Sequence, residues 1–554
     1  MSIPQTLRVT YPSRCLSIRK YVVPGIQAGF RSGYSTLTNI LTLHHLIEAD
    51  ASRHIVFLDF ASAFDSVGWP YLQQELKEQG MNPLVLQLVY QLMYRDMSYS
   101  LIVNGCLSPK QPRTCGLLQG SPLSPILSNR FINSLLHSLN CNSQPTFPSA
   151  LFFADDGVLI APTIPKAQSL LNQASTWAGM HEMSFNIPKC GYIVTNQPIR
   201  TYLPHTLTLN NHTIPHVTSY KYLGVTFASK GIDFVNQGIL LGQRVESCLA
   251  GMQWFSDTWA PRIRLNIFKS ILLPTLEYSL PLLYANYKRE RKAQAWITLT
   301  NAYNNCLTWI AGGNAKRPHI TAHLLGLLPF VDRAQHLFTR FYLHLMAMAP
   351  SNPLRAILDR SNWYPKSNHS MRIHKHDPLL SQFLNPPPAF TKHLSNLQHT
   401  PITLLRHTVL EELSTQKFTQ IRSTIGPHSS KLLQVSMLAN RVPGLDCDLV
   451  LTAPVTDQSR FLAWRRGVFG WGRKCLCGER FDRGHTKCMP YPDPGLTQEQ
   501  QFIYELDRYL IDPDTKYTIV DYLLNNGLWN QARNILNAWT LTMSNLLRSN
   551  TTHH

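Results

Sequence analysis

The sequence predicts an α+β fold, with an antiparallel sheet and packed helices in the first part of the chain and mainly helical structure in the second. From Gln27 to about Phe227, short apolar strand-like runs alternate with amphipathic helical stretches, and turn residues mark the joins. After about Ala228 the strand signals fade, and segments 263–287 and 333–347 carry Leu, Phe and Ile at helical spacing. The 554 residues exceed what a single core accommodates, so several packed units are expected.

Local signals support each expected element. The apolar run 54–60 predicts a buried strand, and Pro83 marks the start of a helix. Asn104-Gly105 predicts a hairpin turn after a strand at 99–103. Further along the chain we expect a helix over 165–179 and short strands at 207–209 and 222–227.

A second predicted hairpin carries two acids. Short apolar strands at 151–154 and 158–161 are separated only by Asp155-Asp156-Gly157, which is the spacing of a tight turn. Both carboxylates are therefore expected at the tip of this hairpin. A lone Asp-Asp-Gly turn is most often a solvated hairpin tip, so further signals have to decide its role.

The composition favours a polyanionic partner. With 51 Lys+Arg against 32 Asp+Glu, the formal net charge is +19, and no block of like charges accounts for it. No apolar run of about 18 residues and no signal peptide stand out, so we expect no membrane segment and a soluble, intracellular protein. Eleven cysteines, an odd number, favour thiols or a metal site over a disulfide framework.

Three segments place carboxylates and a flexible turn at predicted strand ends: LDFASAFDSV (58–67), GLLQGSPLSPIL (116–127) and FFADDGVLI (152–160). Phosphoryl transfer onto a 3′-hydroxyl uses two divalent ions about 4 Å apart, and magnesium prefers oxygen ligands. Asp59, Asp155 and Asp156 could supply those ligands. Asp59 alone would be a strand-end cap, but the conjunction of the three segments favours a metal site.

Six motifs in order resemble a known family, the reverse transcriptases of non-LTR (LINE-type) retrotransposons. QAGFRSGYST (27–36) resembles the Q-x-GFR element of that family. LDFASAFDSV, GLLQGSPLSPIL, FADD (153–156), NIPKC (186–190) and YKYLGV (220–225) are similar to its motifs A, B, C and D and its primer grip. A weaker likeness to the thumb and post-thumb helices continues through 273–285, 304–313 and 324–334.

The resemblance implies a right-hand polymerase fold. The expected domains are a fingers remnant and palm over 1–228, thumb and post-thumb helices over 229–349, a linker-like region rich in Pro, Asn, Ser and His over 350–402, and a helical C-terminal region over 403–554. The implied activity is extension of a DNA 3′-end with dNTPs on an RNA template. The implied partners are the RNA template, the DNA primer and their hybrid, and the nucleus is the implied location.

The family motifs also imply residue roles. Asp59 and Asp155 would bind two Mg²⁺ ions, for which Mn²⁺ could substitute, and Asp156 would complete the acidic cluster. Lys189 would donate a proton to the leaving pyrophosphate, although an unpaired surface lysine is an open alternative. Phe64 would exclude a ribose 2′-hydroxyl, with a core phenylalanine as its alternative. The nucleotide pocket and primer grip would use Arg31, Gln119, Gly120, Tyr222, Leu223 and Gly224.

The chain also departs from the family. Only 26 residues precede Gln27, and they contain no recognisable version of the fingers strands that grip the triphosphate, so we interpret the chain as N-terminally truncated. A rival interpretation is therefore a nucleic-acid-binding remnant that does not polymerise. An intron maturase shares the palm motifs, but the LINE-like post-thumb segments and a terminal cysteine cluster count against it.

That cluster, CLCGERFDRGHTKC (475–488), contains Cys475, Cys477, His485 and Cys488. Three thiols and an imidazole form the ligand set of a closed zinc site, and the cluster resembles the CCHC knuckle of the same elements. Its C-x-C and H-x-x-C spacings are tighter than usual, so unmetallated thiols in a turn are the alternative. The surrounding basic residues favour contact with nucleic acid.

Overall fold

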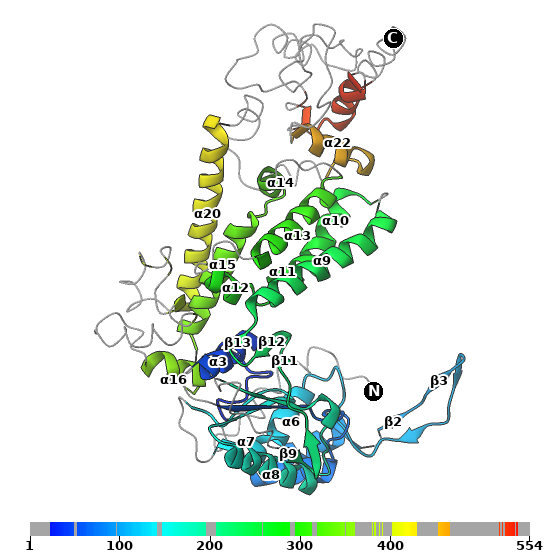
Figure 1. The fold of residues 1–554 in the computed structure, drawn as a ribbon. Helices are drawn as coiled ribbons and strands as arrows, with labels where there is room; N and C mark the ends of the chain where they lie inside the picture. Colours follow the sequence, from blue (N-terminus) through cyan, green and yellow to red (C-terminus); the bar gives the residue numbers. More distant parts are fainter. Residues whose placement is uncertain are drawn as a thin grey trace. The chain divides into compact units, whose positions relative to one another are not determined.

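In the computed structural model, the described residues are 23–48, 53–95, 97–140, 147–195, 206–256, 259–287, 294–312, 318–348, 351–360, 402–428 and 452–465, with scattered positions in 379–391 and 520–540. The chain divides into two compact units. The first contains residues 1–237 and 342–386, and the second contains 238–341 and 387–554. Mixed helix and antiparallel sheet in the first unit and helices in the second confirm the expected α+β class (Figure 1).

A four-stranded antiparallel sheet forms the centre of the first unit, in the order β6-β7-β1-β8. Its strands are β1 (His54–Leu58), β6 (Ala150–Phe153), β7 (Asp156–Ala161) and β8 (Gly191–Val194). All five β1 residues are buried, because β1 pairs with a neighbour on each side and both sheet faces are covered. This explains why the strand appears in the sequence as a continuous apolar run rather than an alternating one.

Each sheet face has its own packing partners. Alternate β1 residues Val56 and Leu58 join a core formed with helices that follow later in the chain. On the other face Phe57 stacks on Tyr220, with ring centroids 4.1 Å apart and an interplanar angle of 6°. The helices contributing to the first core are α4 (Trp69–Glu78), α5 (Pro83–Met93), α6 (Ser124–Phe131), α7 (Asn133–Asn140) and α8 (Ile164–Met180).

Helix starts follow the caps present in the sequence. Thr163 caps α8 by accepting a hydrogen bond from the amide of Lys166, and Asn82 caps α5 by accepting one from Leu84. Both helices have a proline in the first turn. The predicted helix over 165–179 is therefore confirmed as α8.

Two predicted strands were wrong because each contains a break. The expected strand 99–103 is two short strands, β2 (Ser98–Tyr99) and β3 (Ile102–Val103), which pair with β5 (Gln111–Pro112) and β4 (Cys106–Leu107) in a ribbon; the turn at Asn104-Gly105 is confirmed. The expected strand 222–227 is a hairpin of β11 (Ser219–Tyr222) and β12 (Val225–Ala228). Leu223 and Gly224 form its turn with φ of 46° and 77°.

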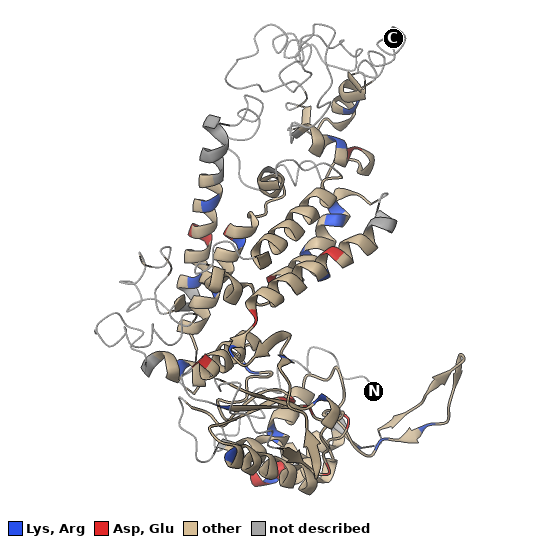
Figure 2. Cartoon of the chain, viewed as in Figure 1, with Lys and Arg blue, Asp and Glu red and all other residues tan. Residues whose placement is uncertain are grey.

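Shorter elements complete the first unit. They are α3 (Thr36–Glu48), η1 (Ile187–Lys189), β9 (Leu207–Leu209), β10 (His212–Ile214), β13 (Gly231–Ile232) and α16 (Pro353–Arg360), and α16 packs on α3. The predicted strand 207–209 is confirmed as β9. In this unit and throughout the described chain, Lys and Arg are scattered over many elements (Figure 2).

The described part of the second unit is helical. Its helices are α9 (Phe234–Ser256, which begins in the first unit), α10 (Pro261–Ile267), η3 (Phe268–Leu272), α11 (Leu273–Glu277), α12 (Leu280–Tyr287), α13 (Gln294–Ile310), α14 (Pro318–Leu324), α15 (Phe330–Met346, which ends in the first unit), α20 (Ile402–His428) and α22 (Val455–Arg465). The segment 263–287 turns at Ser279, whose φ is 57°. Arg333 on α15 holds Glu277 of α11 through two hydrogen bonds. Nowhere in the described chain is a helix both long and apolar enough to cross a membrane.

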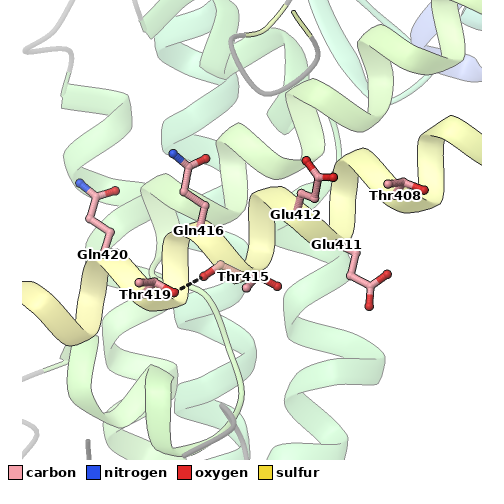
Figure 3. A pocket seen from close by; sticks show the side chains of 7 residues that line it. All are labelled: Thr408, Glu411, Glu412, Thr415, Gln416, Thr419 and Gln420. Carbon is pink, nitrogen blue, oxygen red and sulfur yellow. Dashed lines mark hydrogen bonds between the residues drawn. The ribbon is translucent and has the colours of Figure 1, made fainter. Parts of the chain in front are cut away.

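Helix α20 combines buried apolar residues with polar residues that line a pocket. Its apolar residues Leu405, Val409 and Leu413 are buried, and Lys417 forms a 3.1 Å ion pair with Asp332 of α15. Polar side chains of the same helix line a surface pocket (Figure 3). These are Thr408, Glu411, Glu412, Thr415, Gln416, Thr419 and Gln420, none of which belongs to the motifs identified in the sequence.

Candidate active site

The strand register brings the segment that carries Asp59 next to the hairpin that carries Asp155 and Asp156. Asp59 directly follows β1, and β1 pairs with β7 so that Leu58 lies opposite Gly157. Continuing this antiparallel register by one residue places Asp59 beside Asp156, and cross-strand neighbours share one sheet face. That face is the one on which Phe57 and Tyr220 stack.

The turn that carries the acids differs by one residue from the prediction. Phe153 pairs with Asp156, so the two turn residues are Ala154 and Asp155, and Asp156 is the first residue of β7. Of the two turn residues only Ala154 has a positive φ, 58°. Asp155 is therefore at the tip, while Asp156 is held in the sheet ladder.

The acids repel one another. The pKa of Asp156 is raised to about 6, first by partial removal of solvent around its carboxyl group and then by the negative charges of Asp155 and Asp59. Asp156 as a residue is exposed, so burial alone would be a weak cause, but the neighbouring charges act in the same direction. The ionised cluster is thus electrostatically unfavourable without a cation.

A divalent cation fits this donor set. Carboxylate oxygens are the ligands magnesium prefers, and a cation would relieve the repulsion that raises the pKa of Asp156. In the described part of the chain, no three or more His, Cys, Asp or Glu side chains are already grouped so that they could hold a metal ion. The three aspartates are therefore close together, but their side chains are not yet arranged as a complete metal coordination site.

Lys189 lies next to the acids. It ends η1, and its Nζ is 3.8 Å from Oδ2 of Asp59, with 68% of the lysine side chain exposed. A backbone hydrogen bond also joins the segment of Lys189 to Asp59, because the amide of Asn186 donates to the carbonyl of Asp59 at 2.8 Å. The ammonium group therefore faces both the acidic cluster and solvent.

Tyr220 supports this arrangement and was missed in the sequence analysis. Its hydroxyl donates to the Lys189 carbonyl at 2.6 Å while its ring stacks on Phe57. Burial, reinforced by nearby negative groups that include Asp59 and Asp156, raises the pKa of Tyr220 to about 12. An aromatic residue two positions before the predicted primer-grip tyrosine was the available signal.

The predicted primer-grip residues form the tight turn next to Tyr220. Tyr222 is buried at the end of β11, and Leu223 and Gly224 are the turn residues. The amide of Gln237 donates to the Gly224 carbonyl at 3.3 Å. Leu223 and Gly224 are half-buried at the turn.

Of the predicted nucleotide-pocket residues, Gln119 contacts Asp65, the residue after Phe64. Phe64 is half-buried rather than fully inside the core, and its carbonyl accepts a hydrogen bond from the Leu117 amide at 2.7 Å. Gln119 donates to Asp65 at 3.2 Å, and Arg113 forms a 3.4 Å ion pair with the same carboxylate. Gly120 is exposed with a φ of 86°.

The Arg31 side chain interacts with residues of its own segment. Its guanidinium donates to the carbonyls of Pro24 and Gln27 at 2.6 and 2.8 Å and lies over the Tyr34 ring, 4.2 Å from the centroid. Burial lowers the pKa of Arg31. Its contact with a nucleotide stays a prediction.

Gln27 was also missed as an individual residue. Its buried side-chain amide bonds to both the amide and the carbonyl of Ala154, the residue before Asp155. A glutamine two residues before a glycine within a motif was the only signal in the sequence for such a role. The candidate zinc residues Cys475, Cys477, His485 and Cys488 lie outside the described residues, as does most of the predicted linker 350–402.

Comparisons with known proteins show a similar family over the first part of the chain. Residues 14–227 match the family described as reverse transcriptase (RNA-dependent DNA polymerase). The chain is 28% identical over 292 residues to the RNA-directed DNA polymerase from mobile element jockey of Drosophila melanogaster, covering 48% of this chain and 30% of that protein. It is 27% identical over 219 residues to the Pol polyprotein from type-1 retrotransposable element R2 of Popillia japonica, covering 36% of this chain and 35% of that protein.

The chain spans about a third of the length of these two relatives. Among solved structures, apo telomerase from Candida tropicalis is similar over 68% of this chain and 61% of its own, at 9% identity and a TM-score of 0.33.

The match over residues 14–227, which includes all three aspartates, shows that the chain carries a reverse transcriptase domain. The four-stranded sheet and its helices are thus the palm of a right-hand polymerase. The similarity to the jockey and R2 proteins supports the expected resemblance of this domain to the reverse transcriptases of LINE-type, non-LTR retrotransposons.

Proposed function

We propose that this chain is an RNA-directed DNA polymerase that extends a DNA 3′-end with dNTPs on an RNA template, using two Mg²⁺ ions. One observation carries the proposal: the β1–β7 register makes Asp59 and Asp156 neighbours, with Asp155 in the adjoining turn, inside a reverse transcriptase domain. The charge of +19 supports a polyanionic template and primer.

Each residue has a chemical task in this proposal. Bound Mg²⁺ would activate the primer 3′-hydroxyl and stabilise the charge on the leaving pyrophosphate. Asp59, Asp155 and Asp156 would hold the ions, and Mn²⁺ could replace them. Lys189 would give a proton to the leaving group, a role supported by its exposed ammonium group next to Asp59. Phe64 would pack against the sugar and exclude a 2′-hydroxyl.

The flanking turns would bind the substrates. Gln119 and Gly120 would line the nucleotide pocket, and Arg31 would contact the nucleotide. Tyr222, Leu223 and Gly224 would hold the primer strand. The implied nuclear location stays a prediction.

Primer extension tests the proposal. Purified full-length chain would be given poly(rA)/oligo(dT), dTTP and Mg²⁺, beside a double variant Asp155→Asn and Asp156→Asn. The matched control is Asp233→Asn, because Asp233 is an exposed acid that caps α9 by accepting from the Asn236 amide, which asparagine also does. Extension by wild type and control, with loss in the double variant, is expected. Equal extension by all three would overturn the assignment of the acids.

A second candidate function is nucleic-acid binding without polymerisation. Its support is the net charge of +19, which suits a polyanionic partner whether or not the chain polymerises. Binding of an RNA–DNA hybrid that weakens steeply with added salt, together with no extension at any Mg²⁺ or Mn²⁺ concentration, would establish this second function.

We also propose a zinc knuckle at 475–488 that contacts nucleic acid. Its support is the set of three thiols and one imidazole in 14 residues with basic neighbours. Metal analysis of the purified chain should give one zinc per chain, lost in a Cys475→Ser, Cys488→Ser variant. The exposed cysteine Cys106 offers a control, because Cys106→Ser should keep the zinc. A wild-type chain without zinc would refute the knuckle.

A further inference from the structure

The Gln27 side chain forms hydrogen bonds with both the amide and the carbonyl of Ala154. Its Nε2 donates to the Ala154 carbonyl at 3.0 Å, and its Oε1 accepts from the Ala154 amide at 2.9 Å. The same Oε1 accepts from the Gly29 amide at 2.7 Å. Gln27 is fully buried, so these bonds form where water does not compete for them.

Ala154 needs this support. It is the first of the two turn residues between β6 and β7, and its φ of 58° is a region that favours glycine. An L-residue held there costs about 1 kcal/mol or more and persists only when its surroundings impose it. Ala154 is also buried, so its amide and carbonyl would be left without partners if the Gln27 side chain were absent.

The segment containing Gln27 is itself fixed against the turn. A Cβ on Gly29 would lie 2.2 Å from the Ala154 nitrogen, so the two backbones touch only because residue 29 is a glycine. The Ala28 amide donates to Phe152 at 2.9 Å, which ties the segment to β6. Asn129 of α6 donates to the Gly29 carbonyl at 2.9 Å from the other side.

From this geometry we propose that Gln27 is a positioning residue that sets the conformation of the Ala154–Asp155 turn and thereby the placement of Asp155 and Asp156 against Asp59. The inference rests on the proposed polymerase function and deepens it. Without the Gln27 amide the turn relaxes toward a negative φ at Ala154, and the carboxylate of the next residue moves. Metal binding is then weaker and the chemical step slower, while binding of the hybrid and of the dNTP at other residues is unchanged.

The test compares Gln27→Met, which keeps the side-chain length and removes the hydrogen bonds, with Asn39→Leu. Asn39 is the matched control because it is also a buried amide, and it donates to Phe152 of the same strand at 2.9 Å, two residues before the turn. Gln27→Glu is the second variant, since it keeps an acceptor for the Ala154 amide if the methionine variant does not fold. All are made in the full chain.

Three quantities are measured: kcat and KM for dTTP on poly(rA)/oligo(dT), the Kd for the hybrid, and Mn²⁺ binding followed by electron paramagnetic resonance. For Gln27→Met we expect kcat to fall about ten- to a hundredfold and Mn²⁺ to bind several-fold more weakly, because small misplacements of catalytic groups are costly. KM and the hybrid Kd should stay within about twofold. Asn39→Leu should leave kcat and Mn²⁺ binding near wild type.

Other results would overturn the inference. Gln27→Met with wild-type kcat and Mn²⁺ affinity removes it, and so does a loss matched by Asn39→Leu, which would mean general destabilisation. If the wild-type chain does not extend primers, the polymerase proposal fails, but weaker Mn²⁺ binding in Gln27→Met alone would still support the positioning role. A wild-type chain that binds no Mn²⁺ would end both.

Discussion

Replacing Asp156 with asparagine should stabilise the metal-free protein while removing the proposed polymerase activity. The carboxyl group of Asp156 is crowded by Asp155 and Asp59, and asparagine keeps the shape of the side chain without its charge. The folded state favours the protonated form, so ionisation of Asp156 costs stability. The cost is absent below the ordinary pKa of 3.8, develops as the pH rises and is complete above about 6.

The size of the effect follows from the pKa. A rise from 3.8 to about 6, at about 1.36 kcal/mol per pH unit, corresponds to about 3 kcal/mol. Asp156 is exposed at the start of β7, where water screens the charges, so we expect about 1 kcal/mol. Added Mg²⁺ should reverse the order, because it stabilises the wild type through these carboxylates.

Hydrogen exchange of a peptide spanning 150–161 would measure the difference without requiring both units to unfold together. At about pH 8 without divalent ions, Asp156→Asn should exchange about fivefold more slowly than wild type, which corresponds to about 1 kcal/mol. The control is Asp65→Asn, since Asp65 is paired with Arg113 and its replacement should give no gain.

Two results would refute this reasoning. One is an Asp156→Asn variant that is no more protected than wild type at about pH 8. The other is a difference in protection between variant and wild type that is the same at about pH 8 and about pH 4, because an effect of charge repulsion has to disappear when the wild-type carboxyl group is protonated.

Three further predictions concern other parts of the chain. Phe64→Val should raise incorporation of UTP relative to dTTP on poly(rA) by about tenfold or more, because it removes the ring that would exclude a 2′-hydroxyl; an unchanged ratio would contradict that role. Although burial lowers it, the pKa of His181 is raised overall by its hydrogen bond to Glu75, so its stabilising effect is full below the ordinary value of 6.5 and lost at higher pH. The difference in exchange protection between wild type and His181→Leu should shrink from about pH 5.5 to about pH 8.5, and a constant difference would refute it. Arg333→Met should lower the free energy of unfolding in urea by about 2 kcal/mol, because Glu277 loses both hydrogen bonds from Arg333 while remaining half-buried; a loss under about 0.5 kcal/mol would contradict this.

Local signals in the sequence were enough to place the main acidic elements. The apolar run 54–60 around Asp59 predicted a buried strand, and two apolar runs around Asp155 and Asp156 predicted a hairpin. These features depend on residues close together in the chain. The order of the motifs was enough to indicate the family before any distance was known.

The tertiary structure decided how these pieces meet. The turn is Ala154–Asp155 rather than Asp155–Gly157, because pairing of Phe153 with Asp156 draws the second acid into the ladder. The turn within the expected strand 222–227 was also not predicted, because Leu223 adopts a positive φ without a sequence signal.

What sequence alone determined about this protein is therefore its acidic strand ends, its helices and its resemblance to a family. What only the tertiary structure decided is the support behind the acids: Gln27 reaches Ala154 across 127 residues, and Tyr220 reaches Lys189 across 31. Such contacts carry no local periodicity, because they depend on which strands become neighbours and on which polar groups burial leaves to be satisfied.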